Sequence, residues 1–186
     1  TQAKTLFPYT TLFRSTSISK AIETIGERMN KDEDVLFLFL TSHGTADGVF
    51  ELNNAPLQIQ SLTPDWLKTQ LDSAGIKWRV VVVSSCFSGT FIPPLQDTNS
   101  LIITASAANK TSFGCADDAD FTYFGRAFFD EALRQEHSLV NAFETAKMTI
   151  AEREKEEGFA PSQPQIYIGT EMEQALPMLE EGLFPE

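Results

Sequence analysis

The feature of this sequence that most constrains its fold is a pair of short segments that are apolar almost throughout. Residues 35–40 read VLFLFL and residues 78–83 read WRVVVV, and polar residues bound both segments. A strand with one solvent face alternates apolar and polar side chains, whereas a strand buried on both faces of a parallel sheet is continuously apolar. Both segments therefore predict interior strands of a mainly parallel sheet.

Helical patterns lie before, between and after these strands. Residues 17–29 carry apolar side chains at helical spacing, with Ser17 as the expected N-cap. Thr63-Pro64-Asp65 is a strong helix start, and that helix is expected to stop at Gly75. Helices that alternate with buried strands indicate an α/β protein. Further helices are predicted over residues 123–134 and 139–156, further strands over 101–104 and 165–168, and a small hairpin over 49–52 and 57–59.

Length, composition and charge limit the function classes. The chain has 186 residues, of which 42% are hydrophobic and 22% charged, and this is typical of one globular domain. No segment approaches the roughly 20 consecutive apolar residues that span a bilayer, so no membrane-spanning segment is expected. The formal net charge of −12 would repel a phosphate backbone, which argues against nucleic acid as a partner.

The first residues differ in character from the rest of the chain. Residues 1–15 (TQAKTLFPYTTLFRS) have no helical or strand periodicity and lack the apolar core of a signal peptide. The run LFPYTTLFRS resembles the peptide obtained when a sequencing adapter is translated. We therefore interpret residues 1–15 as a non-native or disordered leader, and residues 16–186 as a single domain that is truncated at its N-terminus.

Two residues with catalytic potential follow the predicted interior strands directly. His43 stands in TSHG after the first strand, and Cys86 stands in SSCFSG after the second. Open α/β sheets place their sites beyond the carboxyl ends of neighbouring strands, so both side chains are expected at the same sheet edge. A histidine there can serve as acid and base for a thiol. If a short helix starts at Cys86, its unpaired N–H groups and its dipole favour the thiolate.

Each of these residues also has an ordinary structural explanation. A free cysteine is usually a small buried apolar side chain, and a single loop histidine is more often a surface residue. The combination of two strand ends, one His-Gly and one cysteine favours catalysis. Gly44 allows a close backbone approach, so that its N–H and the N–H of Cys86 can face a developing oxyanion.

Other polar residues carry weaker patterns. The two cysteines are too few for a disulfide scaffold, and Cys115 is expected to pack near the site without reacting. His137 is expected at the surface. The acidic loop at residues 117–120 lacks the glycine and the closing glutamate of an EF-hand, so no metal site is predicted.

The ordered set of motifs resembles the caspase-like (clan CD) cysteine peptidases, and most closely their legumain branch in its bacterial form. The set contains SHG and SSCFSG, each after an apolar strand, then ITASAANKTSFGC, DFTYFGRAFFDEAL and SQPQIYIG, and it covers residues 18–169. The resemblance implies a caspase-like three-layer α/β/α sandwich with a mainly parallel sheet. It also implies strands before residue 17 that this chain lacks, so an open sheet edge is expected and the fragment could be inactive or unstable.

The resemblance also assigns site residues. It makes Cys86 the nucleophile and His43 the general acid and base, with an oxyanion hole at the amides of Gly44 and Cys86. It lines the pocket for the residue before the scissile bond with Ser84, Thr111, Ser112 and Arg126.

Two pocket positions depart from the family pattern. Eukaryotic legumains have acidic residues in place of Ser84 and Arg126, so their asparagine specificity is not carried over. An arginine at position 126 would suit an acidic or amide-bearing substrate side chain, because it offers a charged bidentate fork. The alternative is a solvated Arg126 that pairs with Asp130 at i,i+4.

The expected function is therefore that of a cysteine endopeptidase that forms a thioester acyl-enzyme on a peptide or protein substrate. No cofactor or metal is expected. The same dyad could pass the acyl group to an amine, as in a transpeptidase or transamidase. Two other classes stay open, a non-catalytic caspase-like binding domain and a flavodoxin-like module with an inert Cys86. The resemblance suggests a bacterial protein with exported or periplasmic relatives, but the sequence fixes neither compartment nor oligomeric state.

Overall fold

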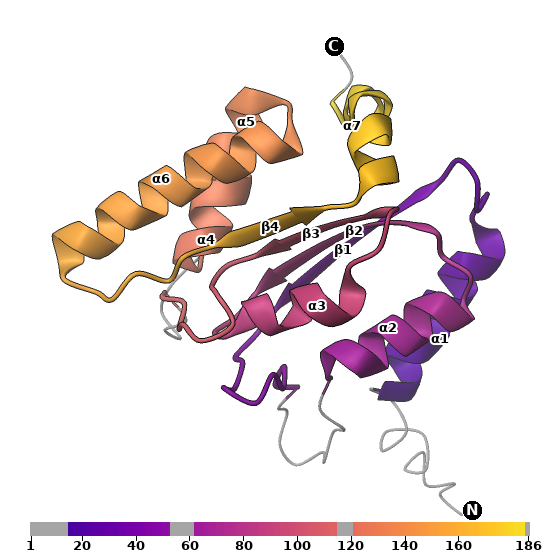
Figure 1. Cartoon of the computed structure of the whole chain (residues 1–186), viewed down its shortest axis with the longest axis horizontal. Coiled ribbons are helices and arrows are strands. Elements are labelled where there is room, and N and C mark those ends of the chain that lie inside the picture. The colour runs from indigo at the N-terminus through magenta and orange to yellow at the C-terminus, as the bar shows by residue number, and fades with distance from the viewer. Residues whose placement is uncertain (1–14, 53–61, 115–120, 185–186) are drawn as a thin grey trace, which may run out of the picture.

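The computed structural model describes residues 15–52, 62–114 and 121–184, which form one open sheet covered by helices (Figure 1). The sheet has the strand order β1-β2-β3-β4. β1 pairs with β2 and β2 with β3 in parallel, and β4 is an edge strand that pairs antiparallel to β3. The strands are β1 (Val35–Thr41), β2 (Trp78–Ser84), β3 (Ser100–Thr104) and β4 (Gln165–Ile168). The sheet is thus mainly parallel, as the two apolar segments predict.

Helices cover both faces of this sheet, which makes three layers (Figure 1). One face carries α1 (Ser15–Arg28), α2 (Pro64–Ser73), the 3₁₀ turn η1 (Ser88–Phe91) and α3 (Ile92–Leu95). The other carries α4 (Tyr123–Gly125), the π-helical segment η2 (Arg126–Ala132), α5 (Leu133–Glu136), α6 (Leu139–Glu157) and α7 (Thr170–Leu183). The predicted α/β class and the three-layer arrangement are confirmed. Within the described ranges, no helix is long and apolar enough to cross a membrane.

The core consists of two apolar clusters, one on each side of the sheet. Val80 and Val82 of β2 face the cluster that contains Phe128 of η2 and Phe143 of α6. The alternate residues of β2, including Val81, face the cluster under α1 and α2. Because side chains of a strand alternate between faces, a strand covered on both sides has to be apolar at every position. This explains the continuous valine run.

Several element boundaries differ from the sequence-based expectation. The predicted cap Ser17 is wrong, because α1 already begins at Ser15 and includes Ser17. Three consecutive cap-forming residue types, Ser-Thr-Ser, leave the start of this helix undefined in the sequence. The strands of the expected hairpin are not formed within the described residues, where Phe50 makes only isolated bridges to Gly44 and Leu62, while residues 53–61 lie outside the description.

Two helical segments are absent from the predicted set. α7 contains Pro177, a residue that normally argues against a helix interior. α3 includes both Pro93 and Pro94, which the sequence suggested as a turn, and proline is well tolerated in the first turn of a helix. By contrast, the Thr63 cap of α2 is confirmed, since its hydroxyl accepts a hydrogen bond from the Trp66 N–H at 3.3 Å.

Candidate active site

The register of the first two strands brings the two catalytic candidates to one place. Thr41 of β1 is paired with Ser84 of β2, so these parallel strands end level with one another. His43 and Cys86 each follow two residues later. Backbone bonds hold the histidine loop in place, because the Glu51 N–H donates to the His43 carbonyl oxygen at 2.9 Å.

Gly44 lies directly against the backbone of the cysteine turn. A Cβ atom added to Gly44 would lie 2.2 Å from the Cys86 carbonyl oxygen and 3.0 Å from Ser85 Oγ. No larger residue fits without a shift of the backbone, so the close approach of the two strand ends requires glycine at position 44. The amides of Gly44 and Cys86 therefore come from adjacent segments. Among the described residues, neither of these N–H groups donates a hydrogen bond to the protein.

The Cys86 side chain is half-buried, and its thiol is free. Its sulfur accepts a hydrogen bond from the Ser112 N–H at 3.3 Å, and the thiol can donate to the Ser112 carbonyl oxygen at 3.4 Å. The helix that could have started at Cys86 begins at Ser88 instead, and it is a single 3₁₀ turn. The Cys86 sulfur therefore contacts the Ser112 backbone and not the N-terminus of a helix.

The His43 side chain is exposed beside this turn. Within the described ranges it forms no hydrogen bond to Cys86 Sγ. Catalytic hydrogen bonds are often long or absent until substrate binds, so the geometry brings the two loops together without closing the dyad.

The four expected pocket residues fall into different environments. Ser84 is 1% exposed, and its hydroxyl lies 3.0 Å from that of Thr122, which caps α4. Ser112 contacts the nucleophile through its backbone, as described above, whereas Thr111 is exposed on the same loop. Arg126 is exposed at the start of η2. Thr122 was not expected from the sequence, because only the fold brings it to Ser84.

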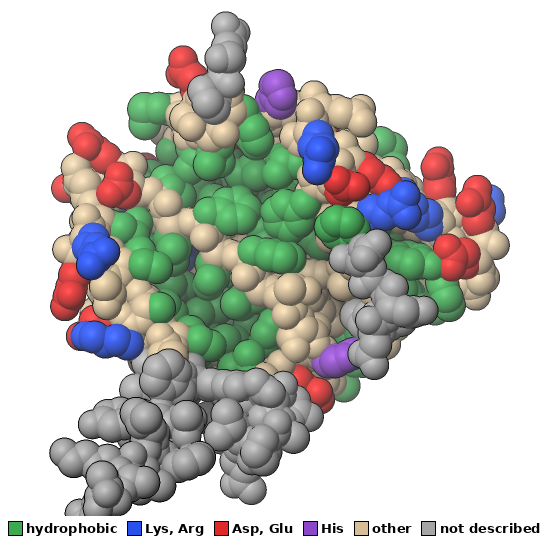
Figure 2. All heavy atoms as spheres, turned by 180° about the vertical axis from the view of Figure 1, so that it is seen from behind, with side chains coloured by type: hydrophobic (Ala, Val, Ile, Leu, Met, Phe, Trp, Pro, Cys, Tyr) green, Lys and Arg blue, Asp and Glu red, His purple; other side chains and the backbone are tan. Residues whose placement is uncertain are grey.

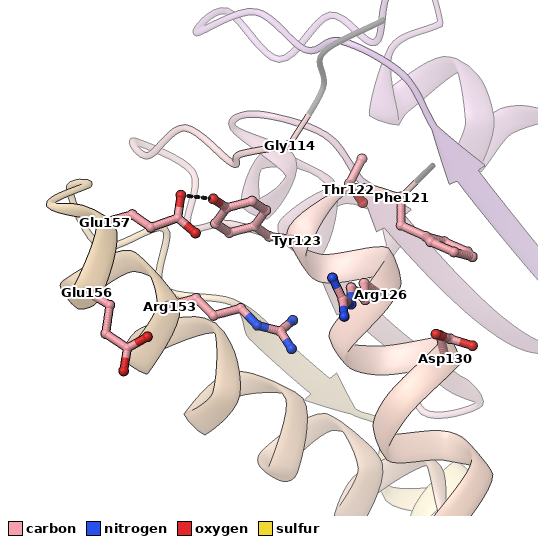
Figure 3. Close-up of a pocket in the computed structure, with 9 residues that line it drawn as sticks. All are labelled: Gly114, Phe121, Thr122, Tyr123, Arg126, Asp130, Arg153, Glu156 and Glu157. Carbon is pink, nitrogen blue, oxygen red and sulfur yellow. Dashed lines mark hydrogen bonds between the residues drawn. The ribbon is translucent and has the colours of Figure 1, made fainter. Parts of the chain in front are cut away.

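A polar pocket of about 740 Å³ opens next to Thr122 and includes Arg126 (Figure 3). Figure 3 shows the Arg126 and Arg153 side chains converging from η2 and α6. The pocket is linked to the cysteine turn in two ways, through the Thr122–Ser84 contact and through Gly114, two residues after Ser112. Its lining consists of Gly114, Phe121, Thr122, Tyr123, Arg126, Asp130, Arg153, Glu156 and Glu157.

Arg126 is held by Glu131 rather than by Asp130. Its Nε donates to Glu131 Oε1 at 2.9 Å, and Arg153 donates to both Glu131 oxygens at 2.6 Å. Asp130 pairs with Arg134 instead, at 3.0 Å. Burial raises the pKa of the Glu131 carboxyl, but hydrogen bonds and charges from Arg153 and Arg126 outweigh it and hold that pKa below its usual value. The alternative ion pair between Arg126 and Asp130 is therefore wrong.

The remaining candidates are peripheral or undescribed. His137 is exposed at the end of α5, as expected, and its ring stacks on Phe184. Cys115 and the acidic loop at residues 117–120 lie outside the described residues. In the part of the chain that the structure describes, no cluster of three or more His, Cys, Asp or Glu side chains could hold a metal ion.

Comparison with known proteins identifies the family to which these features belong. The model of the peptidase C13 family matches residues 18–174, which is most of the chain. The chain belongs to the peptidase C13 family. The match includes both strand ends and every residue of the candidate site, so the chain is a legumain-type member of the caspase-like peptidases.

Two curated relatives of this peptidase C13 chain are plant proteins. It is 36% identical over 84 residues to a legumain from Canavalia ensiformis, an alignment that covers 44% of this chain and 18% of that protein. It is 33% identical over 87 residues to a vacuolar-processing enzyme from Phaseolus vulgaris, with 46% of this chain and 17% of that protein covered. The alignments thus span less than a fifth of these relatives.

A solved structure supports the fold assignment. The crystal structure of caspase-1 from Spodoptera frugiperda superposes with a TM-score of 0.59 at 17% sequence identity, over 83% of this chain and 67% of that one. At such low identity the likeness concerns the fold alone. This peptidase C13 chain therefore has the caspase-like fold.

Proposed function

We propose that this chain carries the catalytic centre of a cysteine endopeptidase, with Cys86 as nucleophile and His43 as general acid and base. The observation that carries the proposal is the level ending of β1 and β2, which puts the His-Gly segment against the Cys86 backbone. The family match supports the same chemistry.

In the proposed reaction, the Cys86 thiolate attacks the scissile carbonyl carbon and forms a C–S bond. The N–H groups of Gly44 and Cys86 donate to the resulting oxyanion. When the tetrahedral intermediate collapses, the C–N bond breaks and protonated His43 gives its proton to the leaving amine. Water then attacks the thioester, His43 takes a proton from it, and the C–S bond breaks to release the acid and the Cys86 thiolate.

Alkylation of Cys86 by iodoacetamide tests the dyad without a guess about substrate. We expect Cys86 to react at neutral pH faster than free cysteine, and we expect His43→Asn to slow it about tenfold or more because the thiolate loses its partner. His137→Asn is the matched control, since His137 is the other histidine and is exposed at the end of α5, where its ring stacks on Phe184. Equal rates in the wild type and in both variants would refute the dyad.

The fate of the acyl group needs a separate measurement. Incubation of the enzyme with a substrate peptide and an added amine nucleophile distinguishes hydrolysis from transfer of the acyl group to the amine. Free acid as the main product supports an endopeptidase, whereas an amide to the added amine supports a transpeptidase or transamidase. If no product forms, and if the alkylation rate of Cys86 is the same in the wild type and in His43→Asn, a non-catalytic domain is favoured.

For the substrate, we propose that the Arg126 pocket takes an acidic or amide-bearing side chain. Within the described ranges Glu131 is the partner of Arg126, whose exposed guanidinium keeps further donors for a ligand. The pocket lining also carries three carboxylates, so a neutral amide, which accepts from arginine and donates to glutamate, is better matched there than a further anion.

A peptide library tests this pocket. Arg126→Lys should lower kcat/KM for the preferred residue about tenfold or more, because one charged hydrogen bond contributes about 1.5–3 kcal/mol. Arg134→Lys is the control, as another exposed arginine on the same helical stretch. Equal losses for all substrate residues would argue against the pocket assignment.

A further inference from the structure

Three buried serines lie beneath the nucleophile, and they form what we call the serine cluster: Ser85, Ser88 and Ser106. Each is at most 1% exposed. Ser85 and Ser88 belong to the cysteine turn after β2, whereas Ser106 follows β3, the next strand in the sheet. The Ser88 and Ser106 hydroxyls are both hydrogen-bonded, whereas Ser85 takes part through its carbonyl oxygen, and its own buried hydroxyl has no partner among the described residues.

Ser88 and Ser106 are bonded reciprocally. The Ser88 N–H donates to Ser106 Oγ at 3.2 Å, and the Ser106 N–H donates to Ser88 Oγ at 3.0 Å. The Ser106 hydroxyl in turn donates to the Ser85 carbonyl oxygen at 3.1 Å. The Ser106 side chain, which follows β3, is therefore hydrogen-bonded to residues on both sides of Cys86, namely Ser85 and Ser88.

The bond to the Ser85 carbonyl has a direct consequence for the next amide. The C=O of Ser85 and the N–H of Cys86 belong to one planar trans peptide unit and point in opposite directions. Holding the Ser85 oxygen toward Ser106 therefore aims the Cys86 N–H away from the cluster. The next N–H along the chain, that of Phe87, cannot serve as an oxyanion donor in its place, because it donates to the Lys110 carbonyl oxygen at 2.8 Å.

The turn that Ser106 supports is a strained one. Phe87 has φ 57°, in the left-handed region that residues other than glycine rarely adopt. Such a conformation costs about 1–2 kcal/mol and persists only where surrounding contacts hold it. Among the described residues, the Ser106 hydroxyl provides the hydrogen bond that holds the Ser85 carbonyl oxygen, and with it the peptide between Ser85 and Cys86.

We propose that Ser106 is a positioning residue, which orients the Cys86 N–H toward the oxyanion through the Ser85 carbonyl. This inference rests on the proposed endopeptidase function, in which that N–H is one of two oxyanion donors. Ser106 touches neither substrate nor sulfur in this role. Its hydroxyl is required, and the rest of its side chain is not.

The test compares Ser106→Ala with two matched variants. Ser106→Thr keeps the hydroxyl and should restore activity. Ser100→Ala removes another fully buried serine of the same strand segment, whose hydroxyl donates to Asp97 at the opposite end of β3. In Ser106→Ala we expect kcat for peptide hydrolysis to fall about ten- to a hundredfold with KM within about twofold, since a misaligned oxyanion donor acts on the transition state.

Alkylation by iodoacetamide separates positioning from general damage. Displacement of iodide passes through no oxyanion, so the Cys86 alkylation rate should stay within about twofold in Ser106→Ala. If alkylation and hydrolysis fall together, or if Ser100→Ala loses as much activity, Ser106 is merely structural and the proposal is wrong. The proposal is also wrong if hydrolysis by Ser106→Ala is unchanged.

Crystal structures of the wild type and Ser106→Ala decide the matter without turnover. A rotated peptide between Ser85 and Cys86 in the variant supports the positioning role, whereas an unchanged peptide overturns it. If the wild-type chain cleaves no peptide and His43→Asn leaves the alkylation rate of Cys86 unchanged, the proposed function is wrong. The two structures still show whether the Ser106 hydroxyl orients the peptide between Ser85 and Cys86.

Discussion

At the scale of single residues, the candidate site depends on how closely two chain segments approach. Gly44 and the cysteine turn belong to different strand ends, and they touch only because no side chain intervenes. The sequence predicted this use of Gly44 from its place after His43. It named Ser112 as a site residue through the family resemblance, but it could not predict that Thr122 would meet the end of β2 or that Ser106 would meet the cysteine turn, because only the tertiary fold brings these two residues there.

Gly44→Ala tests this close approach. The added Cβ would lie 2.2 Å from the Cys86 carbonyl oxygen, so one of the two segments must move and carry an oxyanion amide with it. We expect kcat/KM for peptide hydrolysis to fall about a hundredfold, while overpacking costs about 1–3 kcal/mol of unfolding free energy in urea titrations. Gly182→Ala is the control, since nothing lies within 4 Å of its added Cβ. Full activity in Gly44→Ala would contradict the proposed geometry.

A buried charge at the opposite end of β2 gives a second prediction at this scale. Arg79 has a side chain only 5% exposed, and it donates to Asp72 at 2.9 Å and to the Ile76 carbonyl oxygen at 2.7 Å. Burial raises the pKa of Asp72, but hydrogen bonds from Lys68 and Arg79 outweigh it and lower that pKa below its usual 3.8. Because the folded-state pKa is the lower one, ionised Asp72 stabilises the fold above about pH 4.

We therefore expect Asp72→Asn to reduce the free energy of unfolding by about 1–3 kcal/mol at pH 7, because the buried guanidinium loses the nearer of its two carboxylates and keeps only Asp97 at 3.8 Å. The difference between variant and wild type should shrink as the pH falls from about 5 through the depressed pKa of Asp72. Urea titrations at several pH values measure it. Lys68→Met, which removes the more exposed partner, should cost less. A constant difference across this pH range would rule out the ion pair as the cause.

At the scale of elements, the sequence was most informative where burial dictates every position. The two apolar segments became β1 and β2, and the predicted strand at residues 165–168 became β4 with the same bounds. The direction of β4 and the helix α7 with its internal Pro177 could not be inferred, since both depend on packing against distant segments. Local pattern thus indicated the strands and the helices α2 and α6, whereas the direction of β4 and the helix α7 depend on tertiary contacts.

The π-helical segment η2 is another element that local pattern does not reveal. Apolar spacing predicts one continuous helix over residues 123–134, whereas residues Arg126–Ala132 are wound as a π-helix. A π-helix is hydrogen-bonded from residue i to residue i+5, and within this wider turn Arg126 pairs with Glu131 at i+5 and not with Asp130 at i+4. Such segments often occur at functional sites, and this one orients the arginine of the candidate substrate pocket.

Two carboxylate variants test the winding of η2. Glu131→Gln removes the shared partner of Arg126 and Arg153 and should cost about 1 kcal/mol of unfolding free energy. Asp130→Asn removes only the exposed pair with Arg134 and should cost less than about 0.5 kcal/mol. Urea titration at pH 7 measures both. The Glu131 effect should vanish as pH falls through its depressed pKa, and the reverse order of the two costs would indicate an ordinary α-helix.

At the scale of the whole molecule, the edge of the sheet at β1 is uncovered among the described residues. β1 has β2 as its single neighbour there, and its other edge carries unpaired backbone groups. Phe37 and Phe39 are 37% and 41% exposed, and both rings contact Phe129 of η2 edge-on. Figure 2 shows a broad run of hydrophobic side chains on this side of the molecule. An open edge was expected from the family resemblance.

This edge predicts how the 186-residue chain behaves in solution. An apolar edge strand favours strand pairing between copies, while the net charge of −12 opposes it through repulsion. We therefore expect concentration-dependent self-association that increases with salt, because salt screens the charges within about 10 Å at 0.1 M. Sedimentation velocity over a range of protein and salt concentrations measures it.

The variant Phe39→Lys places a positive charge on the edge strand, so that two paired copies would bring two positive charges together. The variant should therefore stay monomeric at concentrations where the wild type associates. Met178→Lys is the matched control, since Met178 is 74% exposed on α7 and receives the same change in charge and polarity. If both variants suppress association equally, the effect is not specific to the edge strand, and the edge of β1 is not the contact. If neither does, the self-association uses a different surface, and β1 is protected by its own twist and short length.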